Sequence, residues 1–417
     1  MNIEIKNGRL IDPKNGVDRR TSLFVAGERI AGLGDAPAGF VAEQTIDAAG
    51  CVVCPGLIDL GARLNSIEAE LAAAVAGGVT SVVVPPDADP PLDEPELADR
   101  LVHRGEEIGK ARILPLGALT LGLNGERLAE LAGLKKAGCV AFSQANRPMV
   151  DTEALLRAME YAGTFDFAIW LQPQDYWLSR NGFAHEGEVA SRLGLAGIPV
   201  AAETIAIATI LQLVRDTGTR VHLTRLSSAA GVALLKGASD EGLPVSFDVG
   251  VHHLLLTEND IGFFNPHARF NPPLRAQSDR LALSQAAAAG LAAICSDHTP
   301  VAADDKLLPF GEAKPGATGL ELLLPLTLKW AAAAGVSLAD ALARITAAPA
   351  AVLGLPLGSL AAGAAADICI FDAEENWLVT AEALRSRGKN SPWLGYAMSG
   401  RVKTTLVAGR PVFAAGG

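Results

Sequence analysis

The residues best suited to chemistry follow short apolar runs, at the points where buried strands would end. Asp297 and His298 come directly after one such run and could together hold a metal ion or move a proton. Arg63 and Arg225 each follow another. A guanidinium is a fixed cation that binds carboxylates and phosphates but does not ligate a metal ion. These four residues indicate either hydrolytic chemistry or the binding of an anion.

The elements that must position these residues alternate between strand and helix. Ala/Leu/Glu-rich stretches of helical pattern separate most of the apolar runs. Eight such units predict an α/β protein with a (β/α)8 TIM barrel, in which chemistry lies just past the C-terminal ends of the strands. The eight predicted strands are Leu57–Leu60, Val79–Val84, Ile113–Leu116, Val140–Phe142, Phe167–Leu171, Val221–Leu223, Val245–Phe247 and Ala292–Cys295.

The two ends of the chain have a different texture. Residues 1–54 and 358–417 contain short apolar runs broken by Gly, Asp and Asn, which is typical of strands and hairpins. We expect both ends to build one small β-sandwich domain, and residues 55–357 to form the barrel domain.

Composition narrows the classes of function. The chain has 417 residues, of which 49% are hydrophobic and 19% charged, so it can bury a large core. A net charge of −11 argues against nucleic acid and against an anionic membrane surface as partners. No apolar run approaches the roughly 18 residues of a membrane span. Five scattered cysteines suggest no disulfide framework, so a cytoplasmic protein is expected.

Several strand-end motifs resemble those of the amidohydrolase superfamily, and of dihydroorotases in particular. The opening Pro-Gly-Leu-Ile-Asp-Leu at 55–60 is similar to the start of that family's first barrel strand, and 271–275 reads Asn-Pro-Pro-Leu-Arg, as in the family. The resemblance implies a barrel with a β domain from both termini, and zinc at the strand ends. It also implies substrate-pocket positions, which here are Asp87, Asn271 and Arg275 together with Arg63 and Arg225.

Five zinc-ligand positions implied by the resemblance hold residues unsuited to zinc. Only Asp297 keeps a ligand side chain, and the replaced positions are Gly61, Arg63, Gln144, Gln172 and Arg225. We therefore expect no bound cofactor, no catalytic residue, and a vestigial Asp297 whose charge is compensated by Arg63 or Arg225.

The resulting expectation is a dihydroorotase-like subunit of pyrimidine biosynthesis that is not an enzyme. It resembles the pseudo-dihydroorotases, which implies assembly with the catalytic chain of aspartate carbamoyltransferase, and a homodimer. One alternative is an active amidohydrolase with unusual zinc ligands, combining Asp297 with His298, or with His252 or His253. Those last two are expected to point opposite ways on extended backbone. The other alternative is a small-anion binding protein that uses Arg63, Arg225, Asn271 and Arg275.

Overall fold

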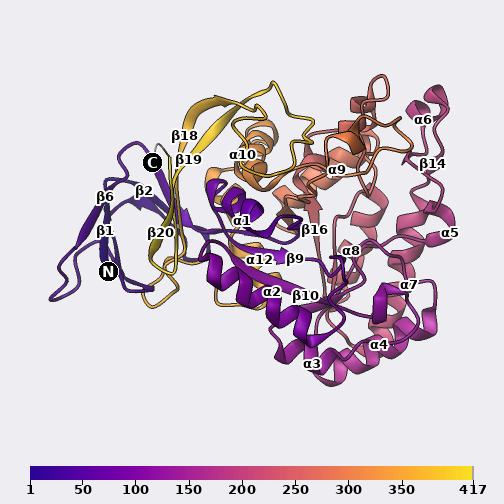
Figure 1. Cartoon of the computed structure of the whole chain (residues 1–417), viewed down its shortest axis with the longest axis horizontal. Coiled ribbons are helices and arrows are strands. Elements are labelled where there is room, and N and C mark those ends of the chain that lie inside the picture. The colour runs from indigo at the N-terminus through magenta and orange to yellow at the C-terminus, as the bar shows by residue number, and fades with distance from the viewer. Residues whose placement is uncertain (416–417) are drawn as a thin grey trace.

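The computed structural model describes residues 1–415 and contains the predicted barrel (Figure 1). All eight predicted strands are present and pair in parallel, and the barrel closes through a single parallel bridge between Ala62 and His298, just beyond the strand ends. In sheet order the strands are β8 (Leu57–Asp59), β9 (Val79–Val84), β10 (Arg112–Ala118), β11 (Ala141–Ser143), β12 (Ile169–Leu171), β15 (Val221–Leu223), β16 (Val245–Gly250) and β17 (Ala292–Cys295).

Helices cover the outside of the barrel. Their ends follow local chemistry: the Asp151 side chain accepts a hydrogen bond from Ala154 N at the start of α4, and Gly218 ends α7 with a left-handed backbone. The covering helices are α1 (Ile67–Ala76), α2 (Pro95–Ile108), α3 (Leu131–Lys136), α4 (Thr152–Thr164), α7 (Ala201–Thr217), α8 (Ala229–Asp240), α9 (Gln277–Ala288), α10 (Leu323–Ala334), α11 (Leu338–Ala343) and α12 (Ala347–Leu353).

One excursion leaves the regular alternation near the barrel mouth. It lies between β12 and β15 and holds α5 (Tyr176–Ser179), β13 (Ala184–His185), α6 (Glu188–Leu193) and β14 (Gly197–Ile198). Short 3-10 turns occur in several of the remaining loops, and they are η1 (Pro13–Asn15), η2 (Leu121–Leu123), η3 (Val251–Leu254), η4 (Glu258–Ile261), η5 (Pro266–Ala268), η6 (Asp304–Lys306) and η7 (Leu320–Leu322).

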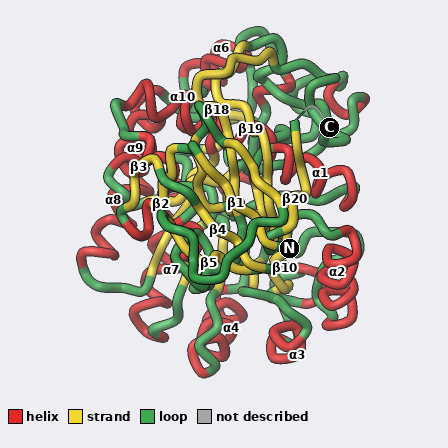
Figure 2. The backbone as a smooth tube through the Cα atoms, turned by 90° about the vertical axis from the view of Figure 1, so that its left-hand side faces the viewer, coloured by secondary structure: helices red, strands yellow, loops and turns green. Residues whose placement is uncertain are grey.

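Strands from both ends of the chain form the second body, which Figure 2 shows facing the viewer. One sheet has the order β5-β4-β1-β6 and the other has the order β20-β19-β18-β7-β2-β3, so the C-terminal strand β18 pairs with β7 from the N-terminal segment. The strands are β1 (Asn2–Lys6), β2 (Arg9–Asp12), β3 (Val17–Arg20), β4 (Leu23–Ala26), β5 (Arg29–Leu33), β6 (Gln44–Asp47), β7 (Val52–Pro55), β18 (Ile368–Leu378), β19 (Ala397–Val407) and β20 (Arg410–Ala414).

The chain passes from this second body into the barrel at Gly56, between β7 and β8. A Cβ atom at Gly56 would lie 2.2 Å from Thr80 Oγ1, so only glycine fits this crossing. Thr405 of β19 donates a hydrogen bond to Val75 O of α1, which ties the two bodies together. Among residues 1–415, no helix has the length and apolar character needed to cross a membrane.

Candidate functional site

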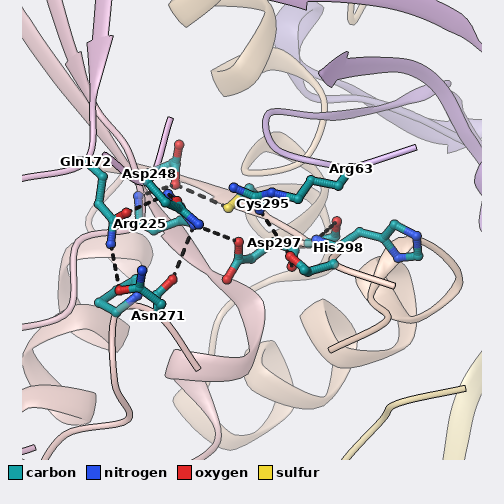
Figure 3. Close-up of polar contacts among 12 residues, drawn as sticks. Arg63, Gln172, Arg225, Asp248, Asn271, Cys295, Asp297 and His298 are labelled. Atoms are coloured by element: carbon teal, nitrogen blue, oxygen red, sulfur yellow. Dashed lines mark hydrogen bonds and ion pairs between the residues drawn. The ribbon is translucent and has the colours of Figure 1, made fainter. Parts of the chain in front are cut away.

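An ion pair between Arg225 and Asp297 lies at the centre of the barrel mouth (Figure 3). Arg225 Nη1 is 3.1 Å from Asp297 Oδ1, and both side chains are more than nine-tenths buried. Burial opposes the charge of Arg225, but the carboxylate of Asp297 and other nearby acidic groups outweigh it and raise its pKa. The expected pairing of Asp297 with an arginine is confirmed, and the arginine is Arg225.

Three polar residues from different loops complete the contacts of the Arg225 guanidinium. Its Nη2 donates to Gln172 Oε1 at 3.0 Å and to Asn146 Oδ1, and its Nη1 also donates to Asn271 O at 3.2 Å. Gln172 in turn donates to Asn271 Oδ1 at 3.2 Å. The structure therefore brings Gln172, Arg225, Asn271 and Asp297 together, as their strand-end positions predicted.

The backbone holds this centre in an uncommon conformation. Ala145, Arg225 and Asp297 each follow a barrel strand, and each has φ near +50°. Non-glycine residues seldom adopt this left-handed conformation, and strained residues of this kind cluster at functional sites. Asp248 of β16 helps to fix it by accepting the backbone N–H of Arg225 at 2.8 Å, while its other oxygen contacts His222 Nε2 at 2.8 Å.

Arg63 also borders this centre, but it binds partners other than Asp297. Its guanidinium pairs with Asp87 at 2.8 Å and donates to Thr299 Oγ1 at 3.1 Å, so it does not reach Asp297. Arg63 and Asp87 border a cleft of about 760 Å³ that runs beside helix α2 and is lined by apolar side chains such as Leu97 and Leu101. Arg63 and Asp87, two of the five predicted pocket residues, thus lie together at one side of the barrel mouth.

Two further predicted site residues serve other contacts. Gln144 is buried against the Thr120 hydroxyl, with 2.9 Å between Nε2 and Oγ1. Arg275 lies under the excursion after β12, where it donates to Ser227 Oγ at 2.8 Å and contacts His185 Nδ1 at 3.2 Å. Gly61 contributes only backbone, since its O accepts the N–H of His298.

The histidines of the mouth are engaged elsewhere. His298 points away from Asp297 (Figure 3). Its Nδ1 accepts two backbone N–H groups, so Nε2 carries the hydrogen and donates to Glu70 at 3.0 Å, with both side chains fully buried. The expectation that His252 and His253 lie on extended backbone is wrong, because β16 ends at Gly250 and both belong to the turn η3. His252 accepts a hydrogen bond from Trp393 Nε1, and burial lowers its pKa to about 3.

Some residues of the site escaped prediction because their partners are distant in sequence. Asp59 is fully buried in β8 and accepts the backbone N–H of Ser296 at 2.7 Å, which holds the loop that carries Asp297. Burial raises the pKa of Asp59 to about 6. Asp248 is the only charge within the apolar run 245–251, and such a charge in a buried strand is a signal that could have found it. Asn146 carries no comparable signal.

The donor set at the strand ends does not fit a zinc ion. Among the described residues, no group of three or more His, Cys, Asp and Glu side chains is placed to hold a metal ion. Arg225 already supplies a positive charge within 3.1 Å of Asp297, and a dication beside it would be repelled. The space left between Gly61, Arg63, Arg225 and Asp297 is about 30 Å³, which suits about one water molecule.

Comparison with known proteins places the chain in a family. The dihydro-orotase-like family model matches residues 50–230, and the amidohydrolase family model matches 186–412. A dihydroorotase-like protein of Pseudomonas putida is 44% identical over 98% of each chain, and a dihydroorotase of Syntrophotalea carbinolica is 39% identical over 98% of each chain. The solved L-hydantoinase (dihydropyrimidinase) of Arthrobacter aurescens has the same fold, with a TM-score of 0.89 and 24% identity over 100% of this chain and 96% of its own.

These relatives correct two expectations. The expectation that the chain is not an enzyme is contradicted, because its relatives include proteins named dihydroorotase and its family is one of amidohydrolase enzymes. The expectation of no cofactor is contradicted on the same ground, since amidohydrolases of the dihydroorotase and hydantoinase kind typically depend on a metal ion. Both expectations inferred too much from the replaced strand-end side chains. The chain belongs to the amidohydrolase family, and within it to the dihydroorotase-like proteins.

Proposed function

We propose that this chain is a cytoplasmic amidohydrolase of pyrimidine metabolism that acts on a cyclic amide bearing a carboxylate, of the dihydroorotate type. The main support for the proposal is sequence similarity along the whole chain. Proteins named dihydroorotase from Syntrophotalea carbinolica and Pelobacter propionicus are 39% and 38% identical to this chain over 98–99% of its length. Five free cysteines, four of them buried, suit a reducing compartment.

The polar groups of the barrel mouth support a ligand of this chemistry. Arg225 is a buried cation that suits a carboxylate or polarises an amide carbonyl, and Asn271 and Gln172 present amide groups beside it. Asp297 is a carboxylate within 3.1 Å of that cation and is the group placed to take a proton. Together they offer an acceptor, donors and a positive charge to one small ligand.

Ligand entry requires a local rearrangement. A six-membered ring with a carboxylate does not fit into about 30 Å³. The contacts of Arg225 with Asn146 and Gln172 join loops after three different strands, so they are the contacts that must open. In this proposal the guanidinium exchanges these amide partners for the ligand's carboxylate.

The test is ring opening of dihydroorotate, and closure of carbamoyl aspartate, by the purified chain with and without added zinc. We expect turnover in the wild type, its loss in Asp297→Asn, and its retention in the matched control Asp166→Asn, whose carboxylate is on the surface and pairs with Arg220. Absence of turnover in both directions under every metal condition, in protein shown to be folded, would overturn the proposal.

A second proposal concerns the partner implied by the dihydroorotase resemblance, the catalytic chain of aspartate carbamoyltransferase. Phe263 and Leu307 are the two most exposed large hydrophobic side chains of the described residues, at 90% and 83%. Their loops are joined where Lys306 Nζ donates to Pro266 O at 2.9 Å. Exposed apolar side chains on adjoining loops suit a protein interface.

Sedimentation of this chain with the aspartate carbamoyltransferase chain of the same organism tests that proposal, and the chain alone tests the homodimer. We expect a joint complex that is weakened in the double variant Phe263→Ser/Leu307→Ser. The control Val41→Ser removes an apolar side chain that is 73% exposed, on the β domain, and should leave the complex unchanged. Separate sedimentation of the two wild-type chains would contradict it.

A further inference from the structure

A second cleft lies next to the barrel mouth and has no role in the chemistry above. It measures about 600 Å³ and opens between the loop 300–307 and the segment 387–390. Four of its lining side chains are basic or can become so, namely His267, Lys306, Arg387 and Lys389. The one acid in the lining is Glu70, and that carboxylate is buried and already bound by His298. The cleft is therefore rich in positive charge within a chain of net charge −11.

Lys306 is the most unusual of these groups. The residue is only 4% exposed, and its ammonium donates to one acceptor, Pro266 O at 2.9 Å, although it carries three N–H groups. Among the described residues, no carboxylate lies within salt-bridge distance of it, and the nearby Asp305 is paired with Lys314. Burial, and then the charge of Arg269, lowers the pKa of Lys306 to about 8. Burial of an unpaired cation costs free energy, so such groups normally have a partner.

The neighbours of Lys306 increase this imbalance. Within residues 1–415, the Arg269 guanidinium donates only to the backbone oxygens of Phe310 and Ala313, and it stacks on the Phe183 ring at 5.1 Å. His267 has a buried Nδ1 with no hydrogen-bond partner in the described chain. His267 and Lys306 line the same cleft, and burial, followed by the charge of Lys306, lowers the pKa of His267. These groups therefore lack a negatively charged hydrogen-bond acceptor that they could share.

We propose that this cleft is a binding site for a small multivalent anion of the phosphate type. A phosphate group offers several acceptor oxygens, which suits an ammonium with free N–H groups, an unpartnered imidazole nitrogen and the rim side chains Arg387 and Lys389. The remaining lining residues, such as Pro300, Val301 and Leu307, are apolar and leave room for a small organic body. The proposal is independent of whether the barrel mouth hydrolyses an amide.

The experiment is thermal unfolding and calorimetric titration with inorganic phosphate, against chloride at equal ionic strength. A ligand that binds only the folded state raises its melting temperature. We expect a saturable rise in the wild type and at least about tenfold weaker binding in Lys306→Met, because a charge-assisted hydrogen bond is lost. The control Lys314→Met removes an exposed lysine of the same region, which pairs with Asp305 and lies outside the cleft, and should bind phosphate normally.

The two lysine variants should also differ without phosphate. Lys306→Met removes an uncompensated buried charge and should melt at or above the wild-type temperature in chloride, with the order reversed in saturating phosphate. If Lys306→Met does not fold, the test is made with the rim variant Arg387→Gln, which should bind phosphate more weakly than the wild type. A phosphate effect equal to that of chloride, or one retained by Lys306→Met or by Arg387→Gln, would overturn the site.

Discussion

The buried ion pair of the barrel mouth leads to a double-mutant prediction. Arg225→Met removes the cation and leaves the Asp297 carboxylate buried without its counter-charge, which costs about 3–5 kcal/mol of unfolding free energy. Asp297→Asn is milder, at about 1–2 kcal/mol, because Arg225 keeps its acceptors on Gln172, Asn146 and Asn271. The double variant leaves no unpaired carboxylate, so its unfolding free energy should be within about 1 kcal/mol of that of Asp297→Asn.

Thermal unfolding gives the assay for this cycle. An unfolding entropy of about 2.1 cal/mol/K per residue over 417 residues means that 1 kcal/mol shifts the melting temperature by about 1 °C. Arg225→Met should therefore melt about 3–6 °C lower, and the second substitution, Asp297→Asn, should recover most of that loss. Strictly additive effects, with a coupling free energy below about 0.5 kcal/mol, would show that the pair does not interact and would refute the reasoning.

Two further predictions concern the carboxyl group of Glu321 and the left-handed backbone at Ala145. Burial raises the pKa of Glu321 to about 7, above its unfolded value of 4.5. Because the folded state then holds the proton more tightly, stability should fall by up to about 3 kcal/mol as pH rises from about 4.5 to 7 and stay level above that. The unfolding free energy, measured by urea unfolding at several pH values, should depend less on pH in Glu321→Gln than in the wild type. An equal pH dependence in the two proteins would show that Glu321 is not the group responsible. Ala145→Gly should stabilise the chain by about 0.5–1 kcal/mol, because glycine adopts the left-handed backbone without strain. The control Ala208→Gly, on the exposed face of α7, should destabilise the chain by about 1 kcal/mol. Equal effects of the two substitutions on the unfolding free energy would show that position 145 is not strained.

The barrel could be predicted from sequence because its signals are local. Parallel strands covered on both faces read as continuous apolar runs, and each of the eight runs became a strand. The strand boundaries differ from the predicted ones at several ends. The strand predicted at 113–116 extends to 112–118, and the one predicted at 245–247 continues to Gly250, because parallel neighbours pair with the additional residues.

The details of the site depend on contacts that no local pattern encodes. The strand-end rule placed both Arg63 and Arg225 at the mouth, but which of them meets Asp297 depends on the left-handed backbone after β15 and on the position of Asp87. The adjacent histidines were misjudged because the end of β16 at Gly250 turns the chain into η3.

The second cleft was not predictable for the same reason. Lys306 reads as an ordinary loop lysine, and its burial follows from the packing of loop 301–310 against Pro266 and Arg269.

The inference from side chains to function also had a limit. Replaced strand-end ligands predicted a chain without activity or metal, while kinship over the whole length places it among dihydroorotase-like amidohydrolases. The replaced residues describe a local change in chemistry, namely an arginine and two amides around Asp297.

The measurement closest to the central claim is the amount of carbamoyl aspartate formed from dihydroorotate by the purified chain, followed over time with and without zinc. The account predicts product in proportion to protein concentration, and none with Asp297→Asn. An absence of product in every condition, from wild-type protein with a normal unfolding transition, would contradict it.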